Sequence, residues 1–269
     1  MKAPRFDYEK PRDLGAALAL LAEGGGEAKI LAGGQSLGPI LNFRLTQPRL
    51  LVDVRGVPEL QTVDDAPDSV YLGACTTHAA IEDGVAPDPT HGLLRSVARG
   101  IAYRAVRNRG TLGGSLAHAD PAADWVNVMA LLDASIMVAS RRAERTIAAT
   151  DLMTGPLSTV LHPDEILIGV RIPRLSRHAR RGYYKFCRKP GEFAEAIGAV
   201  LLDPERQRTR AVVGATGAAP HTIADAGGLF GTDAAATTSA ALHDAGFSPG
   251  TYEWRIHAVV LRRAAAALQ

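Results

Sequence analysis

Cysteine is scarce in this 269-residue chain, and its scarcity excludes several classes of protein. The two cysteines, Cys75 and Cys187, lie far apart and in no C-x-x-C motif. The chain therefore cannot build a disulfide framework or ligate an iron–sulfur cluster by itself, and we expect a reducing, cytoplasmic location. No run approaches about 18 apolar residues, and no apolar stretch follows the first basic residues, so we expect neither a membrane span nor a signal peptide.

An excess of charge of one sign is also missing. Thirty Lys and Arg residues face 28 Asp and Glu residues, and no basic run is interleaved with aromatic residues. This balance argues against a nucleic-acid-binding protein. Basic residues concentrate in one place, at residues 171–188. That cluster is typical of a solvated face or a connector between units, and docking to an acidic partner subunit is the alternative.

Motifs for hydrolysis and for metal binding are absent too. The sequence has no Ser/His/Asp set, zinc motif or pair of carboxylates at a recognisable spacing, so we predict no catalytic residue and no metal ligand. The residues His78, His91 and His118 lack a metal-binding spacing, and we interpret each as an ordinary surface or loop histidine. The P-loop and the G-x-G-x-x-G nucleotide signatures are missing as well.

Two glycine-rich segments are what the sequence does contain. The first, Ala32-Gly33-Gly34-Gln35-Ser36-Leu37, lies between a predicted short strand, residues 28–32, and a predicted short helix, residues 37–45. In such an arrangement the loop amides and the start of the helix converge on a negative group. The first segment is therefore a candidate anion-binding loop.

The second segment, residues 110–124, combines three glycines, two hydroxyls and two carboxylates, and we predict that it is a turn-rich loop. Around Gly113 and Gly114 the backbone N–H groups have little side-chain obstruction, which a loop needs if its main chain is to approach a phosphate. A glycine turn between strands is the alternative for an isolated pair. Two such loops could hold a diphosphate from both sides.

These segments resemble the FAD-binding loops in the flavoprotein subunits of molybdenum hydroxylases, the family of the carbon monoxide dehydrogenase medium subunit and the xanthine dehydrogenase flavin domain. The similarity runs nearly end to end. Beyond the two loops it covers residues 4–8, 53–55, 120–124, 163–167 and 252–263. The resemblance implies an oxidoreductase flavoprotein subunit whose chemistry belongs to the cofactor.

The resemblance also implies which residues contact FAD. Those that would face the pyrophosphate and the ribityl chain are Ala32, Gly33, Gly34, Gln35, Ser36, Leu37, Thr111, Leu112, Gly113, Gly114 and Ser115. Asp124 would accept a hydrogen bond from a cofactor hydroxyl, and Leu167 and Lys185 would lie near the isoalloxazine. Phe193 would stand beside the ring, where carbon monoxide dehydrogenase-type chains have a tyrosine. Plain core packing is the alternative for Leu167, and an ordinary surface position is the alternative for Lys185.

The fold implied is α+β, with two α/β subdomains of the FAD-binding type found in molybdenum hydroxylase flavoproteins and a C-terminal antiparallel sheet with helices. We place the three units at residues 1–54, 55–175 and 176–269. A helix and a loop between short apolar strands predict a small parallel sheet in the first unit. The third unit is predicted to contain strands at residues 183–186, 196–200 and 210–214 and a helix at residues 252–268.

A division of labour between subunits is implied as well. A large subunit would carry the molybdenum–pterin cofactor, and a small subunit would carry two [2Fe–2S] clusters. This chain would pass electrons from FAD to an external acceptor such as NAD, a quinone or oxygen, within a dimer of such heterotrimers. A self-sufficient FAD-dependent oxidase or reductase is the alternative, and a structural subunit without flavin is another.

Overall fold

A small parallel sheet begins the chain in the computed structural model, which describes residues 2–268. The elements of this part are β1 (Asp7–Glu9), α1 (Leu14–Glu23), β2 (Ala28–Leu31), α2 (Leu37–Asn42) and β3 (Leu50–Asp53). The strands lie in the order β1-β3-β2, and both pairings are parallel. The parallel sheet predicted for the first unit is confirmed, and the first glycine segment connects β2 to α2.

A larger antiparallel sheet follows. Its strands are β4 (Val63–Asp65), β5 (Ser69–Gly73), β6 (Ser135–Ala139), β7 (Glu144–Ala148) and β10 (Ile166–Pro173). They lie in the order β4-β5-β10-β6-β7, so the last strand in sequence inserts at the centre. A short ribbon of β8 (Met153–Gly155) and β9 (Ser158–Thr159) precedes that central strand.

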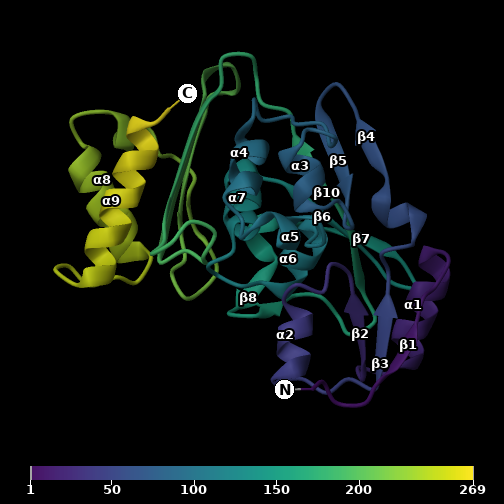
Figure 1. The fold of residues 1–269 in the computed structure, drawn as a ribbon. Helices are drawn as coiled ribbons and strands as arrows, with labels where there is room; N and C mark the ends of the chain where they lie inside the picture. Colours follow the sequence, from purple (N-terminus) through teal and green to yellow (C-terminus); the bar gives the residue numbers. More distant parts are fainter. Residues whose placement is uncertain (1, 269) are drawn as a thin grey trace.

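A series of helices connects β5 to β6. They are α3 (His78–Glu82), α4 (Leu93–Arg99), α5 (Arg104–Arg107), α6 (Leu112–His118) and α7 (Asp124–Leu132). Figure 1 shows them gathered at the centre of the molecule. Every residue of α7 is buried, as expected of a helix enclosed on all sides. Because α7 packs against both β10 and the last sheet, its first residue, Asp124, lies at the junction of two units.

The last sheet is antiparallel and is covered by two helices at the left of Figure 1. The elements here are β11 (Arg180–Phe186), β12 (Ala196–Asp203), β13 (Arg208–Gly214), β14 (His221–Ile223), α8 (Ala234–Asp244) and α9 (Tyr252–Ala266). Helix α9 packs on β11 and β12. The predicted strands and the final helix are confirmed, whereas α5, α8 and β14 were not predicted.

One hydrophobic core extends through all three sheets. It runs from Ala17 of α1, through α7 and the central sheet, to Val212 of β13. A smaller cluster, which includes Leu242 of α8 and Leu261 of α9, fills the space under the C-terminal helices. Because the main core is continuous, it does not divide the chain into the three predicted units, and their boundaries stay a prediction.

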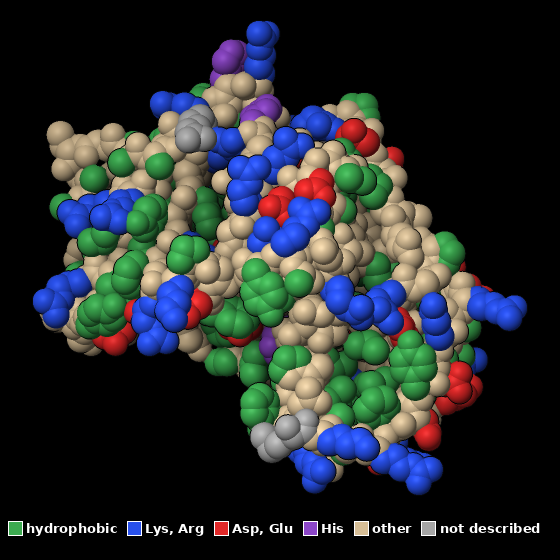
Figure 2. Space-filling view, viewed as in Figure 1, with side chains coloured by type: hydrophobic (Ala, Val, Ile, Leu, Met, Phe, Trp, Pro, Cys, Tyr) green, Lys and Arg blue, Asp and Glu red, His purple; other side chains and the backbone are tan. Residues whose placement is uncertain are grey.

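Charged side chains are scattered over the face shown in Figure 2 rather than gathered over one element. In the basic cluster of residues 171–188, Arg174 forms an ion pair with Asp65 and Arg181 donates to the carbonyl oxygen of Thr90 at 2.9 Å. These contacts reach back to the middle of the chain, which supports the interpretation of this cluster as a connector. No helix within residues 2–268 combines the length and the apolar character that crossing a membrane requires.

Candidate functional site

The first glycine segment leaves its backbone donors free. Within the described residues, none of the N–H groups of residues 33–37 donates to a protein acceptor. Gly34 has a φ of +71°, a left-handed conformation that glycine adopts without strain, and the side chain of Gln35 donates to the carbonyl oxygen of Gly33 at 3.0 Å. Successive amides of such a turn form a concave anion-binding nest. We call residues 33–37 the amide nest.

The two glycine segments lie against each other. A Cβ placed on Gly33 would lie 2.3 Å from the carbonyl oxygen of Arg109 and 2.7 Å from Cα of Gly110. Such distances are impossible for a real side chain, so glycine is required at residue 33. A Cβ placed on Gly114 would lie 3.6 Å from Cβ of Ala32, which is ordinary contact. The structure therefore brings together the two segments that the sequence singled out.

The prediction of a turn-rich loop is wrong for residues 112–118, which form α6. Thr111 is its N-cap residue, and the Thr111 hydroxyl accepts from the N–H of Gly114 at 3.0 Å. Leu112 and Leu116 lie one helical turn apart and are both buried. The cap and this buried apolar pair outweigh the low helix propensity of the two glycines.

The amides at the start of α6 are already used. The N–H of Gly113 donates to the carbonyl oxygen of Ala74 and the N–H of Leu112 donates to the loop before α3, both at 2.9 Å. A Cβ on Gly113 would lie 2.5 Å from Cβ of Ala74, so this glycine allows α6 to pack on the end of β5. The N–H of Thr111 and the hydroxyl of Ser115 are among the donors there that have no acceptor within residues 2–268.

A carboxylate paired with an arginine lies near each of the two segments. Asp53, which pairs with Leu31 directly before the amide nest, accepts from Arg55 at 2.5 Å and also from Tyr8. Burial raises the pKa of Asp53, but the hydrogen bonds from Arg55 and Tyr8 dominate together and lower it to about 2.

Before the second segment, Arg107 donates to Glu82 at 2.7 Å and also to the carbonyl oxygen of Ile101 at 2.9 Å. The hydrogen bond from Arg107 lowers the pKa of Glu82. Both carboxylates are therefore ionised at neutral pH. Glu82 orients Arg107, which holds the backbone of residues 101–102, whereas Asp53 joins Arg55 to Tyr8 beside β2.

His78 is buried, so its interpretation as a surface or loop histidine is wrong; its side chain accepts from Trp125 Nε1 at 3.0 Å through Nδ1. The reason is its position as the first residue of α3, whose buried face continues with Ala79 and Ile81. Burial, with the nearby charge of Arg107, lowers the pKa of His78 to about 4. The ring is therefore neutral at physiological pH.

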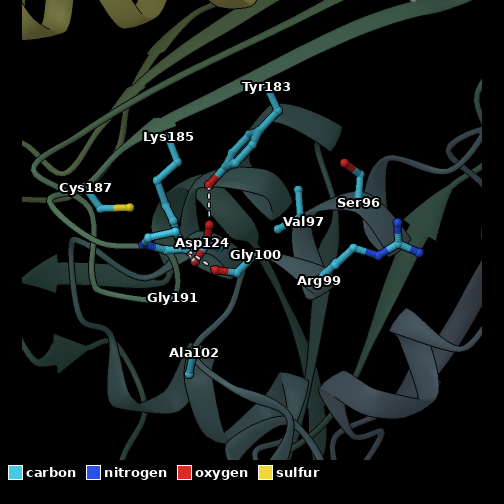
Figure 3. Close-up of a pocket in the computed structure, with 11 residues that line it drawn as sticks. Ser96, Val97, Arg99, Gly100, Ala102, Asp124, Tyr183, Lys185, Cys187 and Gly191 are labelled. Atoms are coloured by element: carbon cyan, nitrogen blue, oxygen red, sulfur yellow. Dashed lines mark hydrogen bonds and ion pairs between the residues drawn. The ribbon is translucent and has the colours of Figure 1, made fainter.

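A cavity of about 330 Å³ lies where α7 begins (Figure 3). It is lined by residues of α4, by Asp124, and by Tyr183 and Lys185 of β11. Asp124 Oδ1 accepts from the Tyr183 hydroxyl at 2.6 Å, and Oδ2 accepts from Lys185 Nζ at 2.9 Å. Lys185 also donates to the carbonyl oxygen of Gly100 at 3.1 Å, which leaves its third N–H without a described acceptor. The structure thus pairs two residues that the resemblance had assigned separately, Asp124 and Lys185.

Tyr183 is the site residue that the sequence reasoning missed. Burial, followed by the charge of Asp124, raises its pKa well above the ordinary value, so the phenol stays a hydrogen-bond donor. Strand alternation offered a signal, because Tyr183, Lys185 and Cys187 follow at intervals of two and all three line the cavity.

Two predicted site residues lie elsewhere. Leu167 is buried in β10, where it pairs with Val138, and it does not line the cavity. Phe193 is 60% exposed and follows the cavity-lining residues Pro190 and Gly191 in the loop after β11. Their assignment to the isoalloxazine stays a prediction.

No group of three or more His, Cys, Asp or Glu side chains within residues 2–268 is arranged to hold a metal ion. The arrangement offers instead a row of amides for an anion and, at the start of α7, a cavity with a fixed carboxylate and ammonium. The amides suit an anionic group, and the cavity suits a polar group that hydrogen-bonds to a carboxylate or an ammonium.

Comparison with known proteins gives consistent matches. Residues 4–175 match the family described as the FAD binding domain in molybdopterin dehydrogenase. The nicotine 6-hydroxylase medium subunit of Paenarthrobacter nicotinovorans is 40% identical over 81% of this chain and 76% of that protein. The carbon monoxide dehydrogenase medium chain of Afipia carboxidovorans is 33% identical over 96% of this chain and 95% of its own. A crystal structure of Cu,Mo-CO dehydrogenase covers 99% of this chain and 98% of its own with a TM-score of 0.88 and 30% identity.

Proposed function

Because this chain belongs to the family of FAD-binding domains in molybdopterin dehydrogenases, we propose that it is the FAD-carrying, electron-transferring subunit of a heteromeric molybdenum hydroxylase. Its relatives are dehydrogenase and hydroxylase subunits, so the chain is an oxidoreductase flavoprotein component with FAD as its cofactor. The remaining question is which residues hold the cofactor and what the chain does for electron transfer.

The observation that carries the proposal is the amide nest packed against Gly110. Free amides at residues 33–37 suit a diphosphate, which carries two phosphates along one path, better than a single phosphate. The N–H of Thr111 and the hydroxyl of Ser115 would contribute from the second segment. A serine hydroxyl can donate to a phosphate oxygen, so Ser115 offers a side-chain donor there.

The cavity at the start of α7 would receive the ribityl and ring end of FAD. Each oxygen of the Asp124 carboxylate accepts one described hydrogen bond and can accept another from a cofactor hydroxyl. Tyr183 holds Asp124 in place, and Asp124 keeps the Lys185 ammonium beside the cavity. Bound FAD supplies the redox chemistry, while these residues position it and set the charge around it.

The proposed partners follow from what the chain does not carry. With two distant cysteines it cannot bind the [2Fe–2S] clusters, so we assign these to a small subunit and the molybdenum cofactor to a large one. The relatives carry names of medium subunits and medium chains. We propose a dimer of heterotrimers in which electrons arrive from the clusters, pass through FAD and leave to an external acceptor.

Isolation of the complex from its source tests the proposal. We expect the native mass of a heterohexamer, molybdenum, iron, and one noncovalent flavin per chain that acid releases and chromatography identifies as FAD. FMN, or a flavin that stays with the polypeptide, would contradict the cofactor assignment. A homomer that contains flavin, lacks molybdenum and iron, and oxidises an organic substrate would contradict the assignment of its role.

A further inference from the structure

A buried asparagine in α7 lies against the segment that leads into Asp124. Asn127 is fully buried, and the residues of α7 other than Asn127 and Asp124 are apolar or aromatic. Nδ2 of Asn127 donates to the carbonyl oxygen of Ala123 at 2.8 Å and to that of Pro121 at 3.2 Å. Its Oδ1 has no hydrogen-bond partner within residues 2–268. A buried polar atom without a partner costs free energy, so an amide here is unfavourable unless its donors are needed.

The orientation of this amide is fixed by chemistry. Both partners of Nδ2 are carbonyl oxygens, which only accept, so the NH₂ group and not the oxygen faces them. The opposite orientation would bring three oxygens together. Oδ1 therefore points to the end of β13, where a Cβ placed on Gly214 would lie 2.0 Å from it. Glycine at residue 214 thus leaves the space that the amide oxygen occupies.

The segment between Asp120 and Asp124 cannot fix its backbone with its own side chains, because residues 121–123 are a proline and two alanines. The peptide unit of residues 121 and 122 is held at both edges. Asn127 donates to its carbonyl oxygen, and Asp120 Oδ1 accepts from its N–H at 2.9 Å. The unit that joins residue 123 to Asp124 is held at its carbonyl oxygen by the same asparagine. Asn127 therefore helps to determine where the backbone of Asp124 lies.

The position of Asp124 matters because its carboxylate is also held from the opposite side (Figure 3). It accepts from Tyr183 at 2.6 Å and from Lys185 at 2.9 Å, and both donors belong to β11. A hydrogen bond weakens when its atoms leave the preferred distance and angle. A further hydrogen bond, from a cofactor hydroxyl, therefore depends on how precisely the backbone of Asp124 is placed.

We propose that Asn127 is a positioning residue for FAD, whose two donors hold the backbone of residues 121–123 so that the Asp124 carboxylate can accept from a cofactor hydroxyl. The proposal rests on the proposed FAD function and deepens it, because it assigns a role to a residue that does not line the cavity. A leucine would match the shape of asparagine and would remove the unpartnered oxygen. Packing alone therefore gives no reason for an amide at this position.

Two substitutions separate positioning from packing, with both quantities measured on the deflavinated complex. Asn127→Leu keeps the shape and removes both donors, so the melting temperature should stay within about 5 °C of the wild type while the dissociation constant for FAD rises about tenfold. Asn127→Ser leaves a small cavity but returns one donor, because a serine hydroxyl in a helix can donate to the carbonyl oxygen four residues earlier, here that of Ala123. It should melt below Asn127→Leu and yet bind FAD within about threefold of the wild type.

The opposite orders of stability and affinity distinguish positioning from a structural role. A purely structural role predicts that FAD affinity falls in the same order as the melting temperature, and this result would overturn the proposal. An affinity of Asn127→Leu equal to that of the wild type would also overturn it, while leaving the FAD function intact. A wild-type complex that binds no FAD would instead contradict the proposed function.

A double-mutant cycle tests whether Asn127 acts through Asp124. In the Asp124→Ala background, Asn127→Leu should change the dissociation constant for FAD by less than about twofold, because the contact that Asn127 positions is already absent. An equal effect in both backgrounds would show that Asn127 acts elsewhere and would overturn the proposal.

A crystal structure of the unsubstituted FAD-bound complex covers the case in which the variants do not fold. We expect Asp124 to accept from a cofactor hydroxyl while Nδ2 of Asn127 keeps both carbonyl oxygens as partners. An Asn127 amide turned away from residues 121 and 123, or an Asp124 carboxylate without a contact to FAD, would contradict the assignment.

Discussion

The glycine pair at residues 33–34 and the pair at residues 113–114 have similar sequence surroundings, yet the structure uses them differently. Around the first pair the backbone donors have no protein acceptors, and the chain turns through a positive φ at Gly34. Around the second pair the backbone is helical, and its amides donate to Ala74, to the loop before α3 and to the Thr111 cap. The first pair opens the main chain to a ligand, whereas the second lets a helix approach a strand.

This difference shows that a glycine pair is weak evidence for a phosphate-binding loop until it is known whether each N–H group has an acceptor within the protein. The two segments still lie in contact, because Gly33 packs directly on Gly110. We therefore expect substitutions in the second segment to affect stability first, and substitutions in the first segment to affect FAD binding first.

The largest effect is expected for Gly113→Val. The new Cβ would lie 2.5 Å from Cβ of Ala74, so α6 would be pushed away from β5. Overpacking of this kind should lower the free energy of unfolding by about 3 kcal/mol, measured by denaturant titration of the apoprotein. Gly38→Ala is the matched control, because a Cβ there meets nothing within 4 Å. Stability equal to the control would show that the second pair has no packing role.

The next effect concerns Asp124 at the far end of the second segment. Asp124→Asn leaves the Lys185 ammonium, whose side chain is 10% exposed, without its counter-charge. We expect the free energy of unfolding to fall by about 2–3 kcal/mol. Adding Lys185→Met should recover part of this loss, which a double-mutant cycle measures. Additive losses would contradict the coupling of the two side chains.

Gly34→Ala tests the first segment and should separate binding from stability. The positive φ makes a side chain there cost about 1–2 kcal/mol, and the turn that aligns the amides should distort. We expect FAD affinity to fall about tenfold. Gly114→Ala, which crowds the Thr111 hydroxyl at 2.8 Å, should weaken α6 by about 1 kcal/mol with a smaller effect on FAD. A larger loss of FAD affinity in Gly114→Ala than in Gly34→Ala would contradict the different roles of the two segments.

The smallest effect on stability is expected when the pH is lowered and Asp53 takes up a proton. Because the pKa of Asp53 is lowered to about 2, its ion pair stabilises the fold fully above the ordinary pKa of 3.8 and is lost as the pH falls through 2. The free energy of unfolding should therefore decline between about pH 5 and pH 2. Asp53→Asn should make this decline shallower, and an unchanged slope would show that the Asp53 ion pair does not contribute to stability.

Much of the fold could be predicted because local patterns set it. A helix and a loop between short apolar strands gave the first parallel sheet, and the strands predicted at residues 183–186, 196–200 and 210–214 correspond to β11 to β13. The strand before the first glycine segment and the helix after it also placed that loop correctly. What local patterns cannot show is which acceptors come from elsewhere in the chain.

The Gly113 amide donates to the carbonyl oxygen of Ala74, and the His78 ring accepts from Trp125. Neither partner lies nearby in the sequence. The second segment and His78 were therefore misjudged for one reason, since their environment is made by tertiary contacts. Tyr183 differs, because its alternation with the predicted site residue Lys185 already placed both on one face of a strand.

The central claim is that residues 33–37 hold the diphosphate through amides that the protein leaves free, while the amides of α6 are used internally. Hydrogen exchange of individual amides, followed by NMR with and without FAD, measures this directly. We predict that the amides of residues 33–37 exchange rapidly in the apoprotein and become protected when FAD binds, while those of residues 112–115 are protected in both states. Protection gained at residues 112–115 and not at residues 33–37 would contradict the account.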